Sequence, residues 1–311
     1  MLIKKLVQIT NKFLPEKPKL HLARFYSRLP FSPPRIGFTP LLECNYSCSY
    51  CFNKNYINPY FRKCARIDYQ EWVSLFNKFP TSLVTIGGGE PLLYKDMDKL
   101  IQGMAKKHII SQVITNLSVN LDVLIKAKKS GFRVMASFHP EMIIKEEFLK
   151  SLLYLKNKGL KNIMVNYIAT PQNLEKYGEY KEFFEKKTGY FFRLDAYEDL
   201  KRDLSNIGQY QIYGINYLAD REKYNNYLPK KCNGGSKYLV VMPDASVYRC
   251  GVSLLYIFAP EYKELVNPLD LGKFYIGNLK DSNFKIDKKD FVCHSPCRWI
   301  CDIELANVRK C

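Results

Sequence analysis

The stretch Glu43-Cys-Asn-Tyr-Ser-Cys-Ser-Tyr-Cys-Phe52 places Cys44, Cys48 and Cys51 in one short loop with the spacing C-x3-C-x2-C. Iron–sulfur clusters are held by cysteine thiolates, normally four of them. Three thiolates so close together predict a 4Fe–4S cluster with one iron left open for another ligand. A structural role or a zinc site is the alternative, because cysteine is often a small buried hydrophobe and C-x2-C pairs frequently bind zinc.

A glycine loop follows some thirty residues later, in Ser82-Leu-Val-Thr-Ile-Gly-Gly-Gly-Glu-Pro91. An apolar, β-rich run ends here in three glycines, a carboxylate and a proline. Glycine lets the backbone approach a ligand closely, and proline fixes the turn that follows. The loop therefore predicts a strand end that offers carbonyl groups and Glu90 to a bound ammonium group. A plain tight turn is the alternative.

Together, the two motifs resemble the hallmarks of the radical S-adenosylmethionine (radical SAM) superfamily. The three cysteines followed by Phe52 match the first hallmark, and Gly88, Gly89, Glu90 and Pro91 match the second. The resemblance implies that S-adenosylmethionine binds the open iron and that the segments around the glycine loop hold its ammonium group. It also implies an enzyme that cleaves this cofactor reductively, with an electron from a flavodoxin- or ferredoxin-type donor. The resulting 5′-deoxyadenosyl radical takes hydrogen from a C–H bond of the substrate.

Short β-rich runs alternate with amphipathic helical runs from Ile36 to about Leu194. Strands are expected at residues 36–42, 83–86, 109–115, 132–137, 162–168 and 190–194. Helices are expected at residues 68–79, 96–107, 121–129, 145–158 and 174–187, with Asp68 and Glu71 as a capping box. This alternation predicts a parallel α/β domain with its ligands at the carboxyl ends of the strands. The resemblance makes it a partial (β/α)6 TIM-like barrel.

Several polar side chains lie at these expected strand ends. The resemblance gives Asn116 and Ser137 contacts to S-adenosylmethionine, although Leu117 replaces the glycine of the usual Thr-Asn-Gly turn. Such residues are also plain turn formers. His139 is expected either to face the substrate or to be a structural histidine, and Asn166 follows at the next strand end.

The C-terminal part carries a second group of cysteines. Cys232 and Cys250 flank an expected hairpin with strands at 238–242 and 246–248, turned at Pro243-Asp244-Ala245. The remaining members follow after a gap with the spacing C-x3-C-x3-C: Cys293, Cys297 and Cys301. A hairpin with two cysteines against a loop with two or three more predicts a four-cysteine cage for a metal centre. Zinc is the alternative to iron and sulfur.

This layout resembles the twitch domain, the shorter form of the SPASM extension of radical SAM enzymes. The resemblance implies a second, auxiliary 4Fe–4S cluster, held by Cys232, Cys250, Cys297 and one of Cys293 or Cys301. Two departures are Ala245, where the turn glycine is usual, and C-x3-C in place of C-x2-C. Cys311 is a further candidate ligand. Cys64 fits neither group, and is expected to be a buried thiol or a hydrogen-atom donor, as in radical epimerases.

Composition bounds the remaining expectations. No apolar run reaches the roughly 18 residues of a membrane-spanning helix, and the N-terminus lacks the pattern of a signal peptide. Ten cysteines in such a chain favour metal binding rather than disulfide bonds, and they favour a cytoplasmic location.

The expected domains are an N-terminal extension (1–35), the barrel (36–228) and the auxiliary domain (229–311). An amphipathic helix within residues 1–14 would dock on the barrel or contact a membrane surface.

The net charge of +18 favours an anionic partner, although lysine-rich composition is an alternative cause. We therefore expect hydrogen abstraction from a small polar, anionic substrate, with oxidation or epimerisation of a sugar or aminocyclitol type. One alternative is a maturase that crosslinks, epimerises or forms thioethers in a ribosomally synthesised peptide. Another is a non-catalytic iron–sulfur or zinc protein that binds an anionic polymer.

Overall fold

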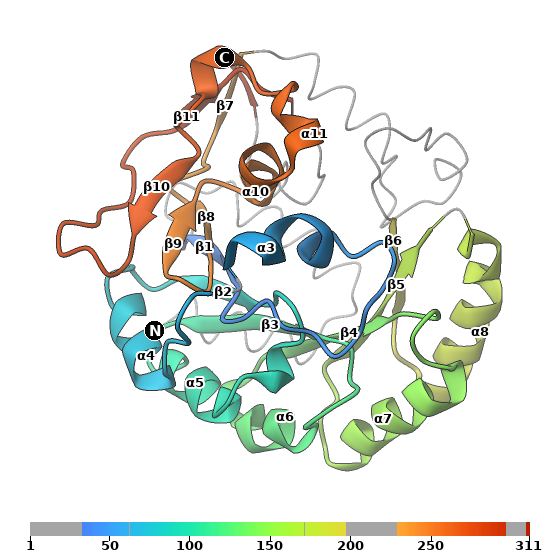
Figure 1. Ribbon diagram of the computed structural model, residues 1–311. Coiled ribbons are helices and arrows are strands. Elements are labelled where there is room, and N and C mark those ends of the chain that lie inside the picture. The colour runs from blue at the N-terminus through green and yellow to red at the C-terminus, as the bar shows by residue number, and fades with distance from the viewer. Residues whose placement is uncertain (1–32, 62, 171, 197–228, 297–308) are drawn as a thin grey trace.

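The computed structural model describes residues 33–61, 63–170, 172–196, 229–296 and 309–311. Within them, one nine-stranded sheet has the order β10-β9-β8-β1-β2-β3-β4-β5-β6 (Figure 1). Six of these strands are the expected ones: β1 (Arg35–Phe38), β2 (Leu83–Ile86), β3 (Ile109–Thr115), β4 (Arg133–Phe138), β5 (Ile163–Ala169) and β6 (Phe192–Ala196). All neighbouring pairs from β1 to β6 are parallel. The predicted parallel α/β arrangement is thus confirmed.

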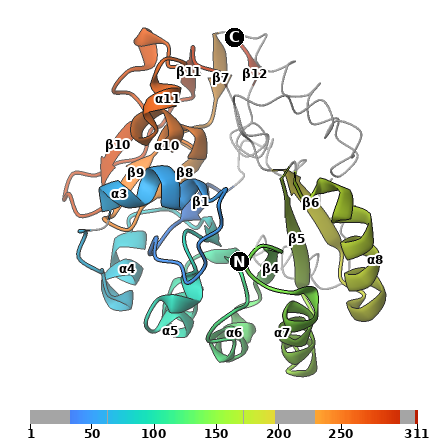
Figure 2. The ribbon, with the colours of Figure 1, turned by 45° about the vertical axis from the view of Figure 1, so that its right-hand side comes forward.

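The expected helices cover the outer face of the curved sheet (Figures 1 and 2). They are α4 (Tyr69–Phe76), α5 (Met97–Met104), α6 (Asp122–Ala127), α7 (Lys145–Asn157) and α8 (Tyr177–Thr188). Short 3-10 turns extend two of them, η3 (Lys128–Ser130) after α6 and η4 (Leu174–Lys176) before α8. Alternate residues of each strand face this helical layer, so Val165 and Tyr167 of β5 lie in the main core while Asn166 points to the inner face.

Aromatic rings fill the core between β1 and α4. Trp72 is fully buried, and its ring meets Phe38 edge-on at a centroid distance of 4.7 Å. Phe76 also lies 4.7 Å from Phe38. Because these rings hold the short strand β1 against α4, they fix the starting point of the cysteine loop that follows β1.

The expected hairpin extends the main sheet. Its strands are β8 (Tyr238–Val241) and β9 (Ser246–Tyr248), and β10 (Tyr275–Asn278) adds antiparallel to β9. β8 pairs in parallel with the free edge of β1, where Ile36 lies opposite Leu239. The backbone N–H of Thr39 also donates to the carbonyl of Val241 at 2.9 Å. A four-residue strand such as β1 gains a second set of backbone bonds in this way, and its edge is covered.

Two sequence departures noted above fall on left-handed backbone. Leu117 has φ 56° and Ala245 has φ 69°, and both side chains are buried. A residue with a Cβ pays roughly 1–2 kcal/mol for this conformation. The turns that usually carry glycine therefore keep a glycine-like conformation here, so the replacements leave the local fold intact.

Some elements were not expected from the sequence. The cysteine loop runs into the single π-helical turn η1 (Asn53–Ile57) and α3 (Asn58–Phe61). In the C-terminal part, α10 (Gly251–Phe258) is apolar on every side and almost wholly buried, so it lacks the amphipathic pattern that reveals a helix. The remaining elements are short: η2 (Pro91–Leu93), α11 (Pro260–Lys263), η6 (Pro268–Asp270), β7 (Lys230–Cys232), β11 (Phe291–Cys293) and β12 (Arg309–Lys310).

The expectations for the N-terminal helix (1–14), for most of the extension 1–35 and for the connector after β6 lie outside the described residues. Across the part of the chain that the structure does describe, no helix has the length and apolar character needed to cross a membrane.

The cap of α4 gives a test of the fold. The Asp68 carboxylate accepts a hydrogen bond from the backbone N–H of Glu71 at 2.8 Å, as the capping box predicted. The Glu71 side chain pairs with Lys280 of the C-terminal part at 3.1 Å. Removing the cap in Asp68→Ala should lower the free energy of unfolding by about 1 kcal/mol. Asp68→Asn keeps an acceptor and should lose much less. Urea denaturation measures both, and equal losses would contradict this role of Asp68.

Candidate metal centre and cofactor site

The three N-terminal cysteines lie in the loop that leaves the carboxyl end of β1. Cys48 is buried, Cys51 is half-buried and Cys44 is exposed. Burial raises the pKa of the Cys44 thiol and raises that of Cys48 to about 11, and the nearby Cys51 raises both further. The three sulfurs are therefore close enough to repel one another as thiolates. A bound cation would relieve this repulsion and hold them deprotonated.

Each of the three sulfurs has a hydrogen-bond donor close by. The backbone N–H groups of Tyr46 and Lys54 donate to Cys44 and Cys51, each at 3.4 Å. The hydroxyl of Tyr50 bonds to Cys48 and lowers the pKa of that thiol against the effect of burial. Donors of this kind stabilise thiolates and orient metal ligands.

This donor set fits an iron–sulfur cluster with three protein ligands. Within the described residues, no three Cys, His, Asp or Glu side chains are close enough together to hold a single metal ion. Cysteine thiolates are the ligands that hold iron–sulfur clusters.

The glycine loop packs directly on the cysteine loop. The N–H of Gly89 donates to Leu41 at 3.1 Å, and the N–H of Glu90 donates to Glu43 at 2.8 Å. A Cβ on Gly89 would lie only 2.1 Å from the carbonyl oxygen of Glu43. Gly88 has φ 115° and would clash with Leu41 in the same way. These glycines therefore allow the two motifs to touch, and the close approach of a ligand to the same loop stays a prediction.

The Glu90 carboxylate binds groups of its own chain. It is 1% exposed and accepts hydrogen bonds from Leu92 N–H at 3.0 Å, Thr115 Oγ1 at 2.8 Å and Asn116 N–H at 2.7 Å. Burial raises its pKa, while these three donors lower it. Glu90 also caps η2, which begins at Pro91. The carboxylate thus joins the glycine loop to the end of β3, and its contact with an ammonium group stays a prediction.

Asn116 lies between the two motifs. Its amide nitrogen is 3.9 Å from the Cys44 sulfur and 3.2 Å from the side-chain oxygen of Asn45. Its amide oxygen accepts a bond from the N–H of Ser118 at 3.0 Å. The structure therefore brings Asn116, Glu90 and Cys44 together, as a shared site would require.

Phe52 and Cys64 pack toward the C-terminal part of the chain. The Phe52 ring contacts two hydrophobic clusters, one around the hairpin and one around α10 and α11. Cys64 packs on the first of these clusters, and burial raises the pKa of its thiol. A cofactor contact of Phe52 and hydrogen donation by Cys64 both remain predictions.

A polar row crosses the inner face of the sheet near the strand ends. Register places Ser137 opposite Asn166 and Asn166 opposite Arg193. Asn166 is 3% exposed, and its amide nitrogen donates to Asp195 at 3.2 Å. Since a carboxylate only accepts, the amide oxygen points away from Asp195. That oxygen is buried and has no hydrogen-bond partner in the described structure. The Arg193 guanidinium lies 3.7 Å from Asp195.

His139 is a partner of the cysteine loop. Its Nδ1 lies 2.8 Å from the Tyr50 hydroxyl, and the two rings stack at 6.0 Å. Burial lowers the pKa of His139 to about 4, so the ring is neutral at pH 7. Of the two expectations for His139, the structural histidine describes these contacts. Sequence reasoning missed this partnership, because nothing in the sequence ties Tyr50 to a residue so far along the chain.

The C-terminal cysteines are only partly within the described residues. Cys232 of β7 lies opposite Phe291, and Cys293 of β11 lies opposite Lys230, so both cysteines share one face of the small sheet β11-β7-β12. Cys232 and Cys250 both pack on the hairpin cluster. The other ligands predicted for this site lie outside the described residues: Cys297 and Cys301. Cys311 is exposed.

The Cys293 thiol has a specific partner. Its sulfur donates to the fully buried carboxylate of Asp270 at 3.6 Å. Asp270 also accepts bonds from Ser295 Oγ at 2.6 Å and from the His294 N–H at 2.8 Å. Burial raises the pKa of Asp270, but these donors outweigh it and the pKa is lowered. Cys293 thus belongs to a network around an ionised carboxylate.

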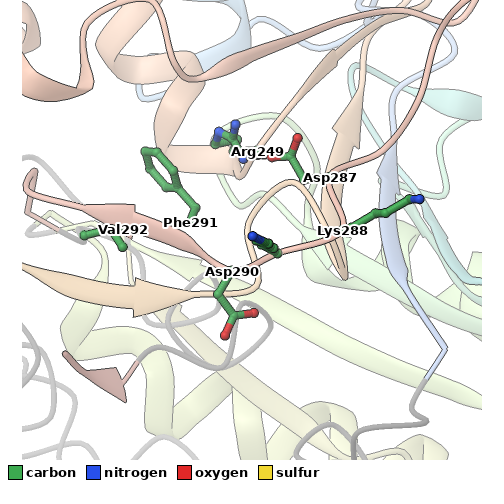
Figure 3. Close-up of a pocket in the computed structure, with 7 residues that line it drawn as sticks. Arg249, Asp287, Lys288, Asp290, Phe291 and Val292 are labelled. Carbon is green, nitrogen blue, oxygen red and sulfur yellow. Dashed lines mark hydrogen bonds and ion pairs between the residues drawn. The ribbon is translucent and has the colours of Figure 1, made fainter.

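A surface pocket lies beside β11 (Figure 3). Arg249 lines it, pairs with Asp287 and covers the ring of Phe291 at 4.4 Å. Arg249 also donates to the carbonyl oxygens of Lys273 at 2.6 Å and Gly234 at 3.1 Å. These bonds make Arg249 a clamp between the hairpin and the loop before β11. None of the residues predicted for the cofactor sites lines this pocket.

Comparison with known proteins finds similarities to one family. Residues 39–184 match the model of the Radical SAM superfamily. GTP 3',8-cyclase of Aquifex aeolicus (strain VF5) is 26% identical, over 45% of this chain and 57% of that relative. A probable GTP 3',8-cyclase of Methanocaldococcus jannaschii is 23% identical, over 61% of this chain and 71% of the relative. This chain therefore spans less than two thirds of the length of the Aquifex relative.

Solved structures share the fold. SuiB of Streptococcus suis bound to S-adenosylmethionine has a TM-score of 0.57 at 16% identity, over 81% of this chain and 64% of that chain. Native anSMEcpe with bound AdoMet has a TM-score of 0.53 at 17% identity, over 80% of this chain and 78% of that chain. The family match and the cyclase relatives are similarities that favour the prediction of an enzyme for radical chemistry. Residues 39–184, which contain both the three cysteines and the glycine loop, thus match the model of the Radical SAM superfamily.

Proposed function

We propose that the chain binds a 4Fe–4S cluster through Cys44, Cys48 and Cys51 and cleaves S-adenosylmethionine at its open iron. The observation that carries this proposal is the direct packing of the glycine loop on the cysteine loop, through the N–H groups of Gly89 and Glu90. This packing supports a cofactor site shared between the two motifs.

The residues around the site have separate tasks in this proposal. When bound, the cluster would supply one electron to S-adenosylmethionine, and the radical so formed would take hydrogen from the substrate. The carbonyl groups from Gly88 to Pro91 would accept the ammonium group of the cofactor, and Glu90 would hold their loop in place. Asn116 and Ser137 would contact the cofactor from β3 and β4, and Phe52 would support the cysteine loop. Cys64 is kept as a proposed hydrogen donor, since its raised pKa leaves it as a thiol.

We propose a small polar, anionic substrate, oxidised or epimerised at a C–H bond. The polar row supports it, because the unpaired oxygen of Asn166 would accept a bond from a hydroxyl or amino group. Arg193 is a positive group on the same inner face. The net charge of +18 would attract an anion, and the curated relatives are named for the anionic nucleotide GTP. An electron donor of the flavodoxin or ferredoxin type, in the cytoplasm, completes the proposal.

A peptide substrate is the second candidate. The support comes from the structural neighbours, since SuiB is also solved bound to the precursor peptide SuiA and anSMEcpe with the Kp18Cys peptide. In that case the chain would be a maturase of a ribosomally made peptide. The third reading, a non-catalytic iron–sulfur or zinc protein that binds an anionic polymer, has no comparable support.

We also propose an auxiliary 4Fe–4S cluster in residues 229–311, in a twitch-like arrangement. Cys232 and Cys250 contact the same hydrophobic cluster, which supports their joint assignment as ligands. Cys293 already donates to Asp270, and a thiolate there would face an ionised carboxylate. This contact favours Cys301 over Cys293 as the fourth ligand beside Cys297.

Anaerobic reconstitution tests the first proposal. The parent should bind two 4Fe–4S clusters and release 5′-deoxyadenosine from S-adenosylmethionine under reducing conditions. The triple variant Cys44→Ala, Cys48→Ala, Cys51→Ala should keep one cluster and lose cleavage. Iron, sulfide and 5′-deoxyadenosine are measured for both. One cluster in the parent and none in the variant would contradict the auxiliary cluster, and a loaded parent without cleavage would contradict the enzyme.

The bond from Thr115 to Glu90 gives a second test. Thr115→Val keeps the shape of the side chain but removes a donor from a buried carboxylate, which should cost about 1–3 kcal/mol of stability. Cleavage of S-adenosylmethionine should fall as the glycine loop loosens. Thr115→Ser keeps the hydroxyl and is the matched control. Urea denaturation and 5′-deoxyadenosine release are measured, and a Val variant that behaves like the Ser variant would refute the role of this bond.

Substrate charge can be tested at Arg193. With S-adenosylmethionine present, GTP as an anionic probe should bind the parent, and Arg193→Ala should weaken it about tenfold, the loss of one charge-assisted contact. Arg193→Lys should weaken it less, and a neutral sugar should not bind. Calorimetric titration measures these affinities. Equal affinity of the parent and Arg193→Ala for GTP would remove Arg193 from the proposed substrate site.

A further inference from the structure

The connection between β4 and α7 holds the cysteine loop at two points. Ser49 lies between Cys48 and Cys51, and its N–H and hydroxyl donate to the two oxygens of Glu141, at 2.9 Å and 2.7 Å. The neighbouring Tyr50 reaches His139 at 2.8 Å. His139 and Glu141 both belong to the connection between β4 and α7. None of these contacts is required by the cofactor roles proposed above.

The Tyr50 hydroxyl has two partners and a single hydrogen. It bonds to Nδ1 of His139 and to the sulfur of Cys48. A metal-bound Cys48 thiolate can only accept, so the hydroxyl hydrogen must point to the sulfur. The neutral imidazole must then carry its proton on Nδ1 and donate it to the hydroxyl oxygen. The direction of both hydrogen bonds is thereby determined: His139 donates to Tyr50, and Tyr50 donates to Cys48.

Contacts between aromatic rings hold His139 and Tyr50 in position for these hydrogen bonds. His139 stacks on Tyr50 and meets the Tyr46 ring edge-on at 6.1 Å, so the imidazole lies between two aromatic residues of the cysteine loop. The Glu141 bonds to Ser49 add a charged acceptor that binds the backbone beside Cys48. His139 and Glu141, which lie outside the cysteine loop, thus hold the Cys48 sulfur in position.

We propose that Tyr50, His139, Ser49 and Glu141 form a clasp that positions Cys48, and that the Tyr50 hydroxyl, oriented by His139, raises the reduction potential of the cluster bound there. Hydrogen bonds to cluster sulfurs are among the features that set the potential of iron–sulfur centres. A donor on a thiolate stabilises the more negative, reduced state more than the oxidised state. The four residues are positioning residues, and the inference rests on the proposed cluster at Cys44, Cys48 and Cys51.

Tyr50→Phe is the sharpest variant, because it removes only the hydroxyl and keeps the stacked ring. The reconstituted parent and variant would be compared by redox titration followed by electron paramagnetic resonance. The signal to follow is the one that S-adenosylmethionine alters, which separates this cluster from an auxiliary one. Tyr50→Phe should shift its midpoint potential to lower values and release iron to a chelator several-fold faster.

Matched controls separate the clasp from general damage. Tyr60→Phe removes a hydroxyl from a tyrosine that is 55% exposed, and it should leave both measurements at the parent values. His139→Asn offers an N–H in place of Nδ1 and should retain more of the parent potential than His139→Leu. Ser49→Ala should accelerate iron release with a smaller shift of potential, since it leaves the Tyr50 bond intact.

Two results would overturn the clasp while leaving the proposed cluster in place, and a third would overturn both. A Tyr50→Phe protein with the parent potential would show that the hydroxyl does not act on the cluster, even if iron were lost faster. Equal potentials for His139→Asn and His139→Leu would remove the imidazole from the chain. A parent that loads no cluster on the three cysteines would refute the proposed function itself, and the clasp with it. Iron counts on the parent distinguish that failure from the first two.

Discussion

The buried carboxylate of Glu90 is the constraint on which the site depends. One side chain, 1% exposed, accepts bonds from its own loop and from the last residues of β3. A buried ionised group is costly unless its lone pairs are satisfied, so these donors must stay in place. They keep the glycine loop at a fixed distance from Asn116, and Asn116 in turn reaches the Cys44 sulfur. The two motifs thus behave as one unit.

The same unit extends into the C-terminal part through β1. That strand is bonded to β2 on one side and to β8 on the other, and the cysteine loop begins immediately after it. Phe52 then packs on the clusters formed by the hairpin and by α10. A displacement of the hairpin would therefore reach the cysteine loop through both backbone and side-chain contacts. In this way the two cysteine groups are mechanically connected even though they lie far apart in the sequence.

Much of the architecture was predictable because local patterns encode it. β2 and β3 begin and end where β-rich runs and turn signals placed them, and Asp68 caps α4 as its spacing indicated. The cysteine and glycine motifs were recognised because their chemistry needs particular residues at short spacing. The features that could not be predicted are contacts between distant parts of the sequence, or elements without a periodic hydrophobic pattern. The β1–β8 pairing, the apolar helix α10 and the bond between Tyr50 and His139 leave no periodic signal. Likewise, the close contact of the two glycines with the cysteine loop was not foreseen, because it joins residues that lie far apart in the sequence.

The pairing of β1 with β8 has a consequence for the order of assembly on the ribosome. Ile36 is synthesised early, whereas its partner Leu239 emerges about 200 residues later. Until then one edge of β1 has no strand beside it, and the surface that receives Phe52 does not exist. The nascent cysteine loop therefore lacks both of these supports through most of translation. Delivery of iron and sulfur for the proposed cluster would therefore follow the emergence of the hairpin from the ribosomal tunnel, when the scaffold that holds the loop is complete.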